Sequence, residues 1–395
     1  MLKNKMRKAI ALFTGVLSAF VMINSTGCKK QEVEYYPEVV VDENDNTQKD
    51  TSDGKVDDGN EVEDEEAALF MTYDSIANEG KFVFNTSLIH PVYREAVREN
   101  PKLLKVAQKV LDAIYECKDS VELTEEEEIT VAEQGIVENL IYYSSPVVTC
   151  VNASLDESNS NVINLVYFAD YARSAEEGRF VSRFTQEESK ERMDQFKDYV
   201  SKTINDNIKP EHTSEERARI IYEALIKDLT VAYPDPDDGG LLEYFDQNKL
   251  PEGSVADTPI EQILEKKVEP FELIRLYDFF LAQLNVNCVL VGARGHYQKQ
   301  EIQKLDDLME GCMIDMWPIV VIDDETAYNC DILFDKIAYD DEFKGELGEE
   351  PDPLYFGMSD TARNKSLNII GKRAVFSVTP TQTPDLPLCD KDYKK

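Results

Sequence analysis

The chain has 395 residues, of which 42% are hydrophobic and 30% charged, so it can build one or two globular domains with tails. Its formal net charge of -36 argues against nucleic acid as a partner, because such a surface repels phosphate backbones. The same charge repels anionic lipid, so a membrane link requires a covalent or hydrophobic anchor.

The N-terminal segment has the layout of a secretory signal. Four basic residues within the first eight positions precede an apolar run over 9–23, and small or polar residues at 25–27 stand directly before Cys28. The run is too short and wrongly flanked for a spanning helix.

Ser-Thr-Gly-Cys resembles the lipobox of bacterial lipoproteins, with Ser25 in place of the usual Leu. The resemblance implies cleavage after residue 27 and a diacylglycerol on the Cys28 sulfur. The competing interpretation is a plain secreted protein.

The first half of the chain alternates between polar and structured segments. Residues 28–66 are rich in Asp, Glu, Asn and Ser without periodicity, which predicts a lipidated Cys followed by a disordered acidic tether. Helical and β-hairpin segments fill 67–210, a lead-in region. Apolar spacing predicts a helix over 101–117, capping boxes predict helices after Thr124, Thr185 and Thr213, and β-branched runs predict a hairpin of strands 147–151 and 162–168.

The pattern of the second half predicts a loop and a buried helix over 259–284, followed by four strands. The strands are expected over 288–291, 314–322, 327–334 and 369–378, and a Pro-rich tail is expected over 379–395.

Five elements follow one another from about 213 to 335: a capped helix, a long loop, a buried helix, a strand ending in Gly, and an antiparallel strand pair. Asn285-Val286 follows the buried helix, Gly292 ends the strand, Asp315-Met316-Trp317 opens the pair, and Asp331 closes it. This order resembles the transglutaminase-like (papain-related) domain, which has Gly-Ile, Gly, His-x-Trp and Asp in those places. The resemblance implies an α+β fold for 211–378, with a helix packed on a small antiparallel sheet.

In that family a Cys at the helix N-terminus is the nucleophile, a His takes its proton and an Asp orients the His. The resemblance carries the Cys to Pro270, by spacing from Asn285-Val286, or to Glu269, by the preceding Lys-Val pair. It carries the His to Asp315 and the Asp to Asp331. Neither candidate for the Cys has a sulfur, and Asp315 is a weak base at neutral pH. The acyl-transfer chemistry is therefore expected to be lost, which leaves Trp317 and Asp331 to line a ligand cleft.

The alternative is an active cysteine hydrolase or acyl transferase whose site is rebuilt from other residues. The nearby candidates are Cys288, Cys312, Cys330 and His296. We expect Cys288 to be a buried, inert thiol within an apolar strand and His296 to lie on a solvated loop. A solute-binding lipoprotein is a third class, but it needs two lobes, and no doubly wound βαβ series is found.

No cofactor and no metal site are expected, because the seven cysteines and three histidines show no CxxC spacing and no Cys/His cluster. One alternative stays open. If Glu269, Asp315 and Asp331 converge as the family triad does, three carboxylates in one cleft require a cation or a proton. The cleft would then bind a divalent cation or a basic peptide group, and separate exposed carboxylates are the competing interpretation.

The sequence therefore predicts an exported, extracytoplasmic protein that is held at the cell surface by the lipid on Cys28. Its degenerate transglutaminase-like domain is expected to bind a peptide, a cell-wall component or another surface protein, and not nucleic acid.

Overall fold

The computed structural model describes residues 80–155, 161–232, 256, 258–297, 315–323, 326–343, 351–367, 369–375 and 387–393. The expected signal peptide, Cys28, the acidic tether and Cys312 lie outside these residues. The described part has an α+β fold, with helices packed around small, mostly antiparallel sheets. Within it, no helix combines the length and apolar character that a bilayer crossing requires.

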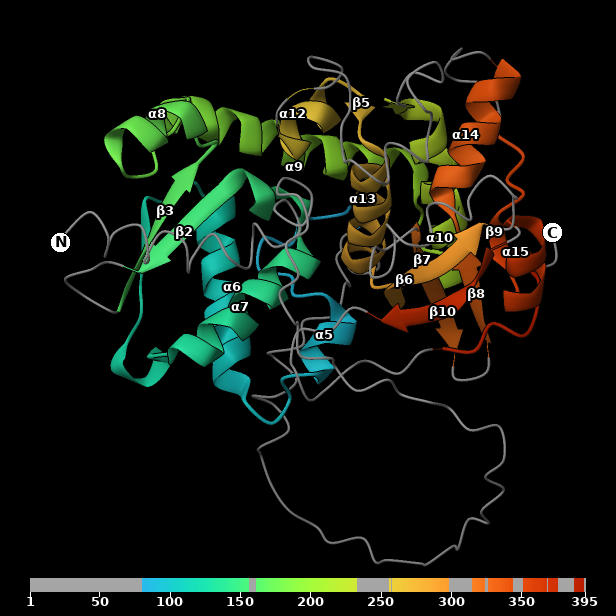
Figure 1. The fold of residues 1–395 in the computed structure, drawn as a ribbon, viewed down its shortest axis with the longest axis horizontal. Helices are drawn as coiled ribbons and strands as arrows, with labels where there is room; N and C mark the ends of the chain where they lie inside the picture. The colour runs from blue at the N-terminus through green and yellow to red at the C-terminus, as the bar shows by residue number, and fades with distance from the viewer. Residues whose placement is uncertain are drawn as a thin grey trace, which may run out of the picture.

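The lead-in region holds a three-stranded antiparallel sheet and several helices, on the left in Figure 1. The sheet order is β1-β3-β2, and the elements are α5 (Pro91–Glu95), α6 (Pro101–Tyr115), β1 (Ser120–Glu122), α7 (Val131–Ser144), β2 (Val151–Leu155), β3 (Val162–Tyr167), α8 (Tyr171–Glu177) and α9 (Gln186–Asn207). The hairpin is confirmed, but its first strand was placed too early. Residues Pro146–Cys150 form a 3-10 helix, because Pro146 opens it and the Ser145 hydroxyl accepts a hydrogen bond from the Val147 amide.

The capping boxes mark helix starts, with one correction. Thr185 caps α9 and Thr213 caps α10 (Ser214–Asp228), each with a Glu three residues later, as predicted. The box at Thr124 caps only a 3-10 turn, Glu125–Glu127. Helix α7 begins behind a second box, in which Thr130 accepts from the Glu133 amide.

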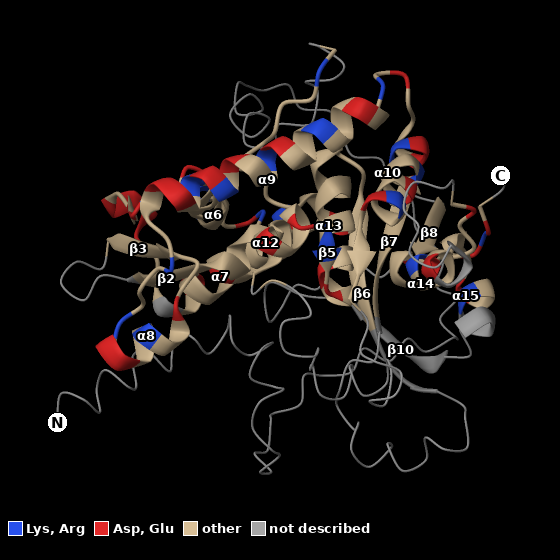
Figure 2. Ribbon diagram, turned by 90° about the horizontal axis from the view of Figure 1, so that it is seen from above, with Lys and Arg blue, Asp and Glu red and all other residues tan. Residues whose placement is uncertain are grey.

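Acidic and basic residues alternate along the outer side of α9 (Figure 2). They form pairs one helical turn apart, such as Lys190 with Asp194 (2.6 Å) and Lys202 with Asp206. The exposed side of α9, the longest of the described helices, therefore carries charges of both signs, although the chain as a whole is strongly acidic.

The second half centres on a buried helix and a five-stranded antiparallel sheet of order β10-β6-β7-β8-β9. The elements are β4 (Thr230–Val231), α12 (Pro259–Leu264), β5 (Lys267–Val268), α13 (Pro270–Gln283), β6 (Cys288–Tyr297), β7 (Asp315–Asp323), β8 (Thr326–Cys330), α14 (Ile332–Phe343), β9 (Phe356–Met358), α15 (Asp360–Leu367) and β10 (Ile369–Val375). Figure 1 shows α13 between the lead-in helices and this sheet. Apolar side chains from both halves form one continuous core, and almost every residue of α13 is buried in it.

Three boundaries in this half differ from the sequence prediction. Strand β6 continues to Tyr297 because β10 pairs with it along its whole second part, so residues 292–296 are not a loop. Strand β8 ends at Cys330, and α14 starts two residues later. The C-terminal segment was expected to be a tail, but Cys389 is buried and the Tyr393 amide donates to the Gly357 carbonyl.

Gly357 is required where that segment packs against the edge strand β9. Its φ is +74°, and a Cβ at this position would lie 2.2 Å from the Tyr393 Cβ. Only glycine accommodates both the left-handed backbone and the close approach.

Candidate functional site

The N-terminus of α13 carries a carboxyl group where the family resemblance places a thiol. Glu269 is the N-cap and Pro270 the first helical residue, a position that suits proline because its missing N–H would be unpaired there. The Glu269 amide donates to the Gln262 side-chain oxygen (3.0 Å), and the Gln262 amide group lies 3.5 Å from the Glu269 carboxylate. Burial, followed by the negative charge of Glu272, raises the pKa of Glu269 to about 7. The group is a weak acid rather than a nucleophile.

Asp331 is held in a buried ion pair instead of facing an imidazole. Its Oδ2 accepts a hydrogen bond from the Arg363 Nη2 (2.8 Å), and both side chains are almost completely buried. The Arg363 guanidinium carbon lies 3.3 Å from the centre of the Trp317 ring. Burial raises the pKa of Asp331, and Arg363 opposes that shift.

Trp317 is fully buried and does not line an open surface. Its indole N–H donates to the Asn329 Oδ1 (2.8 Å), and the Asn329 amide donates to Asp360 (2.8 Å) and to the Met358 carbonyl (3.1 Å). Trp317 is thus hydrogen-bonded to Asn329, and Asp331 to Arg363. Both side chains are buried by these contacts, which do not support the prediction that the two residues line a ligand cleft.

The topology brings the predicted triad positions toward one end of the domain. Strand β6 returns along α13 and β7 reverses again, so the start of β7, the end of β8 and the N-terminus of α13 lie toward the same end. The Asp315 side chain lies outside the described residues. Glu269 is bound by Gln262 and Asp331 by Arg363, so two of the three proposed cation ligands already have other partners.

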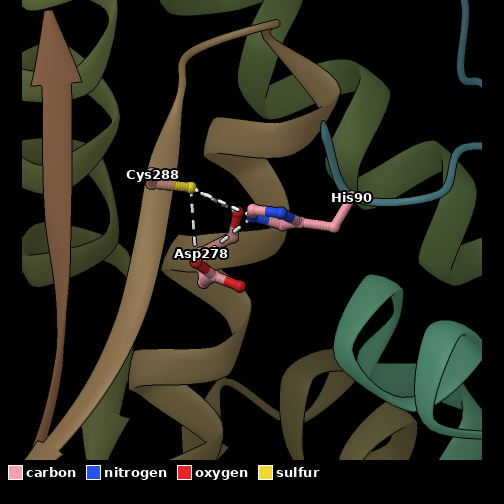
Figure 3. A group of neighbouring side chains, drawn as sticks. All are labelled: His90, Asp278 and Cys288. Carbon is pink, nitrogen blue, oxygen red and sulfur yellow. Dashed lines mark hydrogen bonds and ion pairs between the residues drawn. The ribbon is translucent and has the colours of Figure 1, made fainter. Parts of the chain in front are cut away.

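A different cluster, which the sequence did not predict, lies farther along α13. Figure 3 shows His90, Asp278 and Cys288 converging from three segments: the residue before α5, the middle of α13 and the first residue of β6. The His90 Nε2 lies 3.2 Å from the Cys288 Sγ and 3.6 Å from the Asp278 Oδ1. The Sγ lies 3.3 Å from the same carboxylate oxygen.

The backbone on each side fixes this cluster. The His90 amide donates to the Ser144 Oγ (2.9 Å), and the His90 carbonyl accepts from the amides of Tyr93 and Arg94. Cys288 follows a tight connection in which Asn285 has φ +51°, a left-handed conformation that asparagine tolerates. All three side chains are buried, with exposed fractions of 1% for His90, 4% for Asp278 and 0% for Cys288.

This arrangement is not that of a Cys–His–Asp catalytic triad. In a triad the imidazole bridges the other two groups, with one nitrogen at the nucleophile and the other at the carboxylate. Here both Asp278 and Cys288 face Nε2, while the His90 Nδ1 is buried and has no hydrogen-bond partner in the described part of the chain. Burial, and next the negative charge of Asp278, also raises the pKa of the Cys288 thiol well above its usual value. The expectation of a buried thiol at Cys288 is confirmed.

Of the other residues considered for a rebuilt site, the structure describes the side chain of Cys330 and the backbone of His296. Cys330 is buried at the end of β8, and its Sγ contacts the Tyr328 carbonyl. His296 was expected on a loop, which is wrong, because it lies in β6 opposite Ile370 of β10. Four described cysteines, Cys117, Cys150, Cys288 and Cys330, are free and buried, and Cys389 is buried as well.

Local sequence patterns gave almost no sign of the His90 cluster. His90 and Cys288 are 198 positions apart, and neither belongs to a spaced motif. The one local signal was Asp278, an acidic residue in the middle of a helix that is otherwise buried and largely apolar.

No protein-family model matches this chain, and no curated protein matches it.

Proposed function

We propose that the protein is exported and lipid-anchored through Cys28, and that its transglutaminase-like domain has no acyl-transfer activity. The domain acts as a binding module for a peptide, a cell-wall component or another surface protein. The observation that carries the proposal is the N-terminus of α13, where Glu269 and Pro270 stand in the place of a nucleophilic cysteine.

Two structural features support the family resemblance. Helix α13 packs on β6 and β7 of an antiparallel sheet, as a helix–sheet domain of this kind requires. Asn285, which stands in the place of the family's Gly after the helix, has the left-handed backbone that favours glycine or asparagine.

The ion pair of Asp331 supports the loss of catalysis. A carboxylate that orients a catalytic histidine accepts the imidazole N–H. In this chain Asp331 accepts from Arg363, which packs on Trp317, so the carboxylate contributes to the core rather than to proton transfer.

An active cysteine hydrolase is the second candidate, because the Cys288 thiol contacts the His90 imidazole. Two observations count against an active hydrolase: all three side chains are buried, and the His90 imidazole does not bridge the thiol and the carboxylate with its two nitrogens. The reactivity of the thiol separates the two candidates.

In the native full-length protein, Cys288 is expected to react with iodoacetamide no faster than Cys150. A chelator is present throughout, so that no metal ion blocks a thiol. Both thiols are buried; burial and then Asp278 raise the pKa of Cys288, and burial raises that of Cys150 to about 12. Quenched time courses with peptide mass spectrometry give the rate at each cysteine. Alkylation of Cys288 about tenfold faster than Cys150 would support the hydrolase instead.

Replacing Cys28 by alanine is expected to abolish incorporation of labelled palmitate in a bacterial expression host, since the lipobox resemblance makes this sulfur the lipid acceptor. Labelling is measured on the immunoprecipitated protein, and Cys117→Ala, which changes a buried thiol, should still label. A wild-type protein that is cleaved and exported but carries no label would indicate a plain secreted protein.

A further inference from the structure

The donor atoms of His90, Asp278 and Cys288 form a compact triangle. Among the described residues they are the one group of three potential metal ligands with donor atoms within 4.8 Å of one another. The set contains one imidazole nitrogen, one carboxylate oxygen and one sulfur, drawn from three segments (Figure 3).

The dimensions of the triangle fit one face of a tetrahedral zinc site. Zinc binds sulfur at about 2.3 Å, and imidazole nitrogen and carboxylate oxygen at about 2.0–2.2 Å, which at tetrahedral angles sets the ligand atoms about 3.4–3.6 Å apart. The separations here are 3.2 Å for His90 with Cys288, 3.3 Å for Cys288 with Asp278 and 3.6 Å for His90 with Asp278. An ion would require shifts of only about 0.4 Å or less.

The Tyr93 hydroxyl at this place is also buried and has no hydrogen-bond partner among the described residues. The rings of Tyr93 and His90 are 5.1 Å apart, and both residues are 1% exposed. Because a buried unpaired polar group costs about 1–3 kcal/mol, this hydroxyl beside the cluster indicates that a group from outside the chain, such as water on a bound ion, completes the site.

The charges of the three side chains also favour a metal cation at this site. A buried carboxylate next to a thiol and an imidazole has no fully charged cation among these neighbours. A divalent ion that displaces the thiol proton to solvent would be surrounded by one thiolate, one carboxylate and one neutral imidazole, which gives a site without net charge. Sulfur and imidazole ligands select zinc and related transition metals over calcium or magnesium.

We propose that His90, Asp278 and Cys288 bind a single transition-metal dication, with zinc as the ion that fits best. Water occupies the fourth position, where the Tyr93 hydroxyl is the nearby group to accept its hydrogen bond. The ion joins the segment before α5 to α13 and β6, so it cross-links the lead-in region to the helix–sheet domain.

The test uses the full chain, reduced, stripped with chelator, incubated with Zn²⁺ or Co²⁺ and desalted. Elemental analysis is expected to find about one more zinc per chain in the wild type than in Cys288→Ser or His90→Gln. Cys150→Ser, which changes another buried free thiol and leaves the acidic tether intact, should retain the extra equivalent.

Cobalt gives a second readout that carboxylates of the tether cannot imitate. The wild type and Cys150→Ser are expected to show a thiolate-to-cobalt charge-transfer band in the near ultraviolet, and Cys288→Ser is expected to lack it. Because the wild-type spectrum needs no mutation, a variant that fails to fold does not obscure the result.

Equal zinc content in the wild type and Cys288→Ser, or a wild-type cobalt spectrum without a thiolate band, would overturn the proposal. Either result would leave the cluster as a metal-free polar contact. The proposed loss of acyl-transfer chemistry is tested separately, because the reactivity of the Cys288 thiol is measured in chelator, where no ion is bound and the metal content cannot affect the result.

Discussion

Replacing Arg363 by methionine is expected to lower the free energy of unfolding by about 3–5 kcal/mol. The substitution keeps an unbranched apolar chain over Trp317 but leaves the buried Asp331 carboxylate without its cation. A buried charge that has lost its partner costs far more than the pair itself contributes. Trp317 is the single tryptophan and is fully buried, so its fluorescence reports unfolding in urea directly.

A second substitution separates the charge from the packing. Asp331→Asn in the Arg363→Met background removes the orphaned charge, and is expected to recover a large part of the lost stability. Arg219→Met is the matched control, since Arg219 also pairs with a carboxylate, Glu223 (2.7 Å), and lies 5.6 Å from the centre of the Tyr393 ring. The Arg219 side chain is 29% exposed, so this loss should stay below about 1 kcal/mol.

The outcome bears on function as well as stability. A cost for Arg363→Met no larger than that for Arg219→Met would mean that Asp331 does not depend on its ion pair. Asp331 would then be available to orient another group, and the argument for a purely structural carboxylate would fail.

Replacing Glu269 by glutamine is expected to change how stability depends on pH. Burial and then Glu272 raise the pKa of Glu269 to about 7 in the folded protein, against about 4.3 in an unfolded chain. The folded state therefore binds this proton more tightly, and its stabilising contribution, full below about pH 4, is lost as pH rises through 7. The glutamine has no charge to bury, so relative to wild type the variant should gain roughly 2 kcal/mol between pH 5 and pH 8.

Urea unfolding of both proteins at several pH values measures this difference. Glu265→Gln is the control, because Glu265 is an exposed residue that follows α12 and should leave the pH profile of the wild type unchanged. A difference in the free energy of unfolding between Glu269→Gln and wild type that stays constant from pH 5 to pH 8 would show that the pKa of the Glu269 carboxyl is not raised. The helix N-terminus would then hold an ordinary ionised glutamate.

The sequence by itself determined the elements whose signals are local. Apolar residues at helical spacing predicted α6 and α13, and Thr-x-x-Glu boxes predicted the starts of α9 and α10, because a helix must satisfy its first amides within one turn. The same reasoning predicted that Cys288 would be buried. These signals failed at element ends, as where Pro146 starts a 3-10 helix, because competing local patterns there differ little in energy.

Only the tertiary structure decided which side chains meet. Arg363 reaches Asp331 from a helix 32 positions later, and Tyr393 returns to Gly357 from a segment expected to be a tail. His90 joins Asp278 and Cys288 because the segment before α5 packs on α13, although no spacing in the sequence relates the three. Periodicity records which face of an element is buried, whereas the partner on the other side is fixed by the packing of the whole chain.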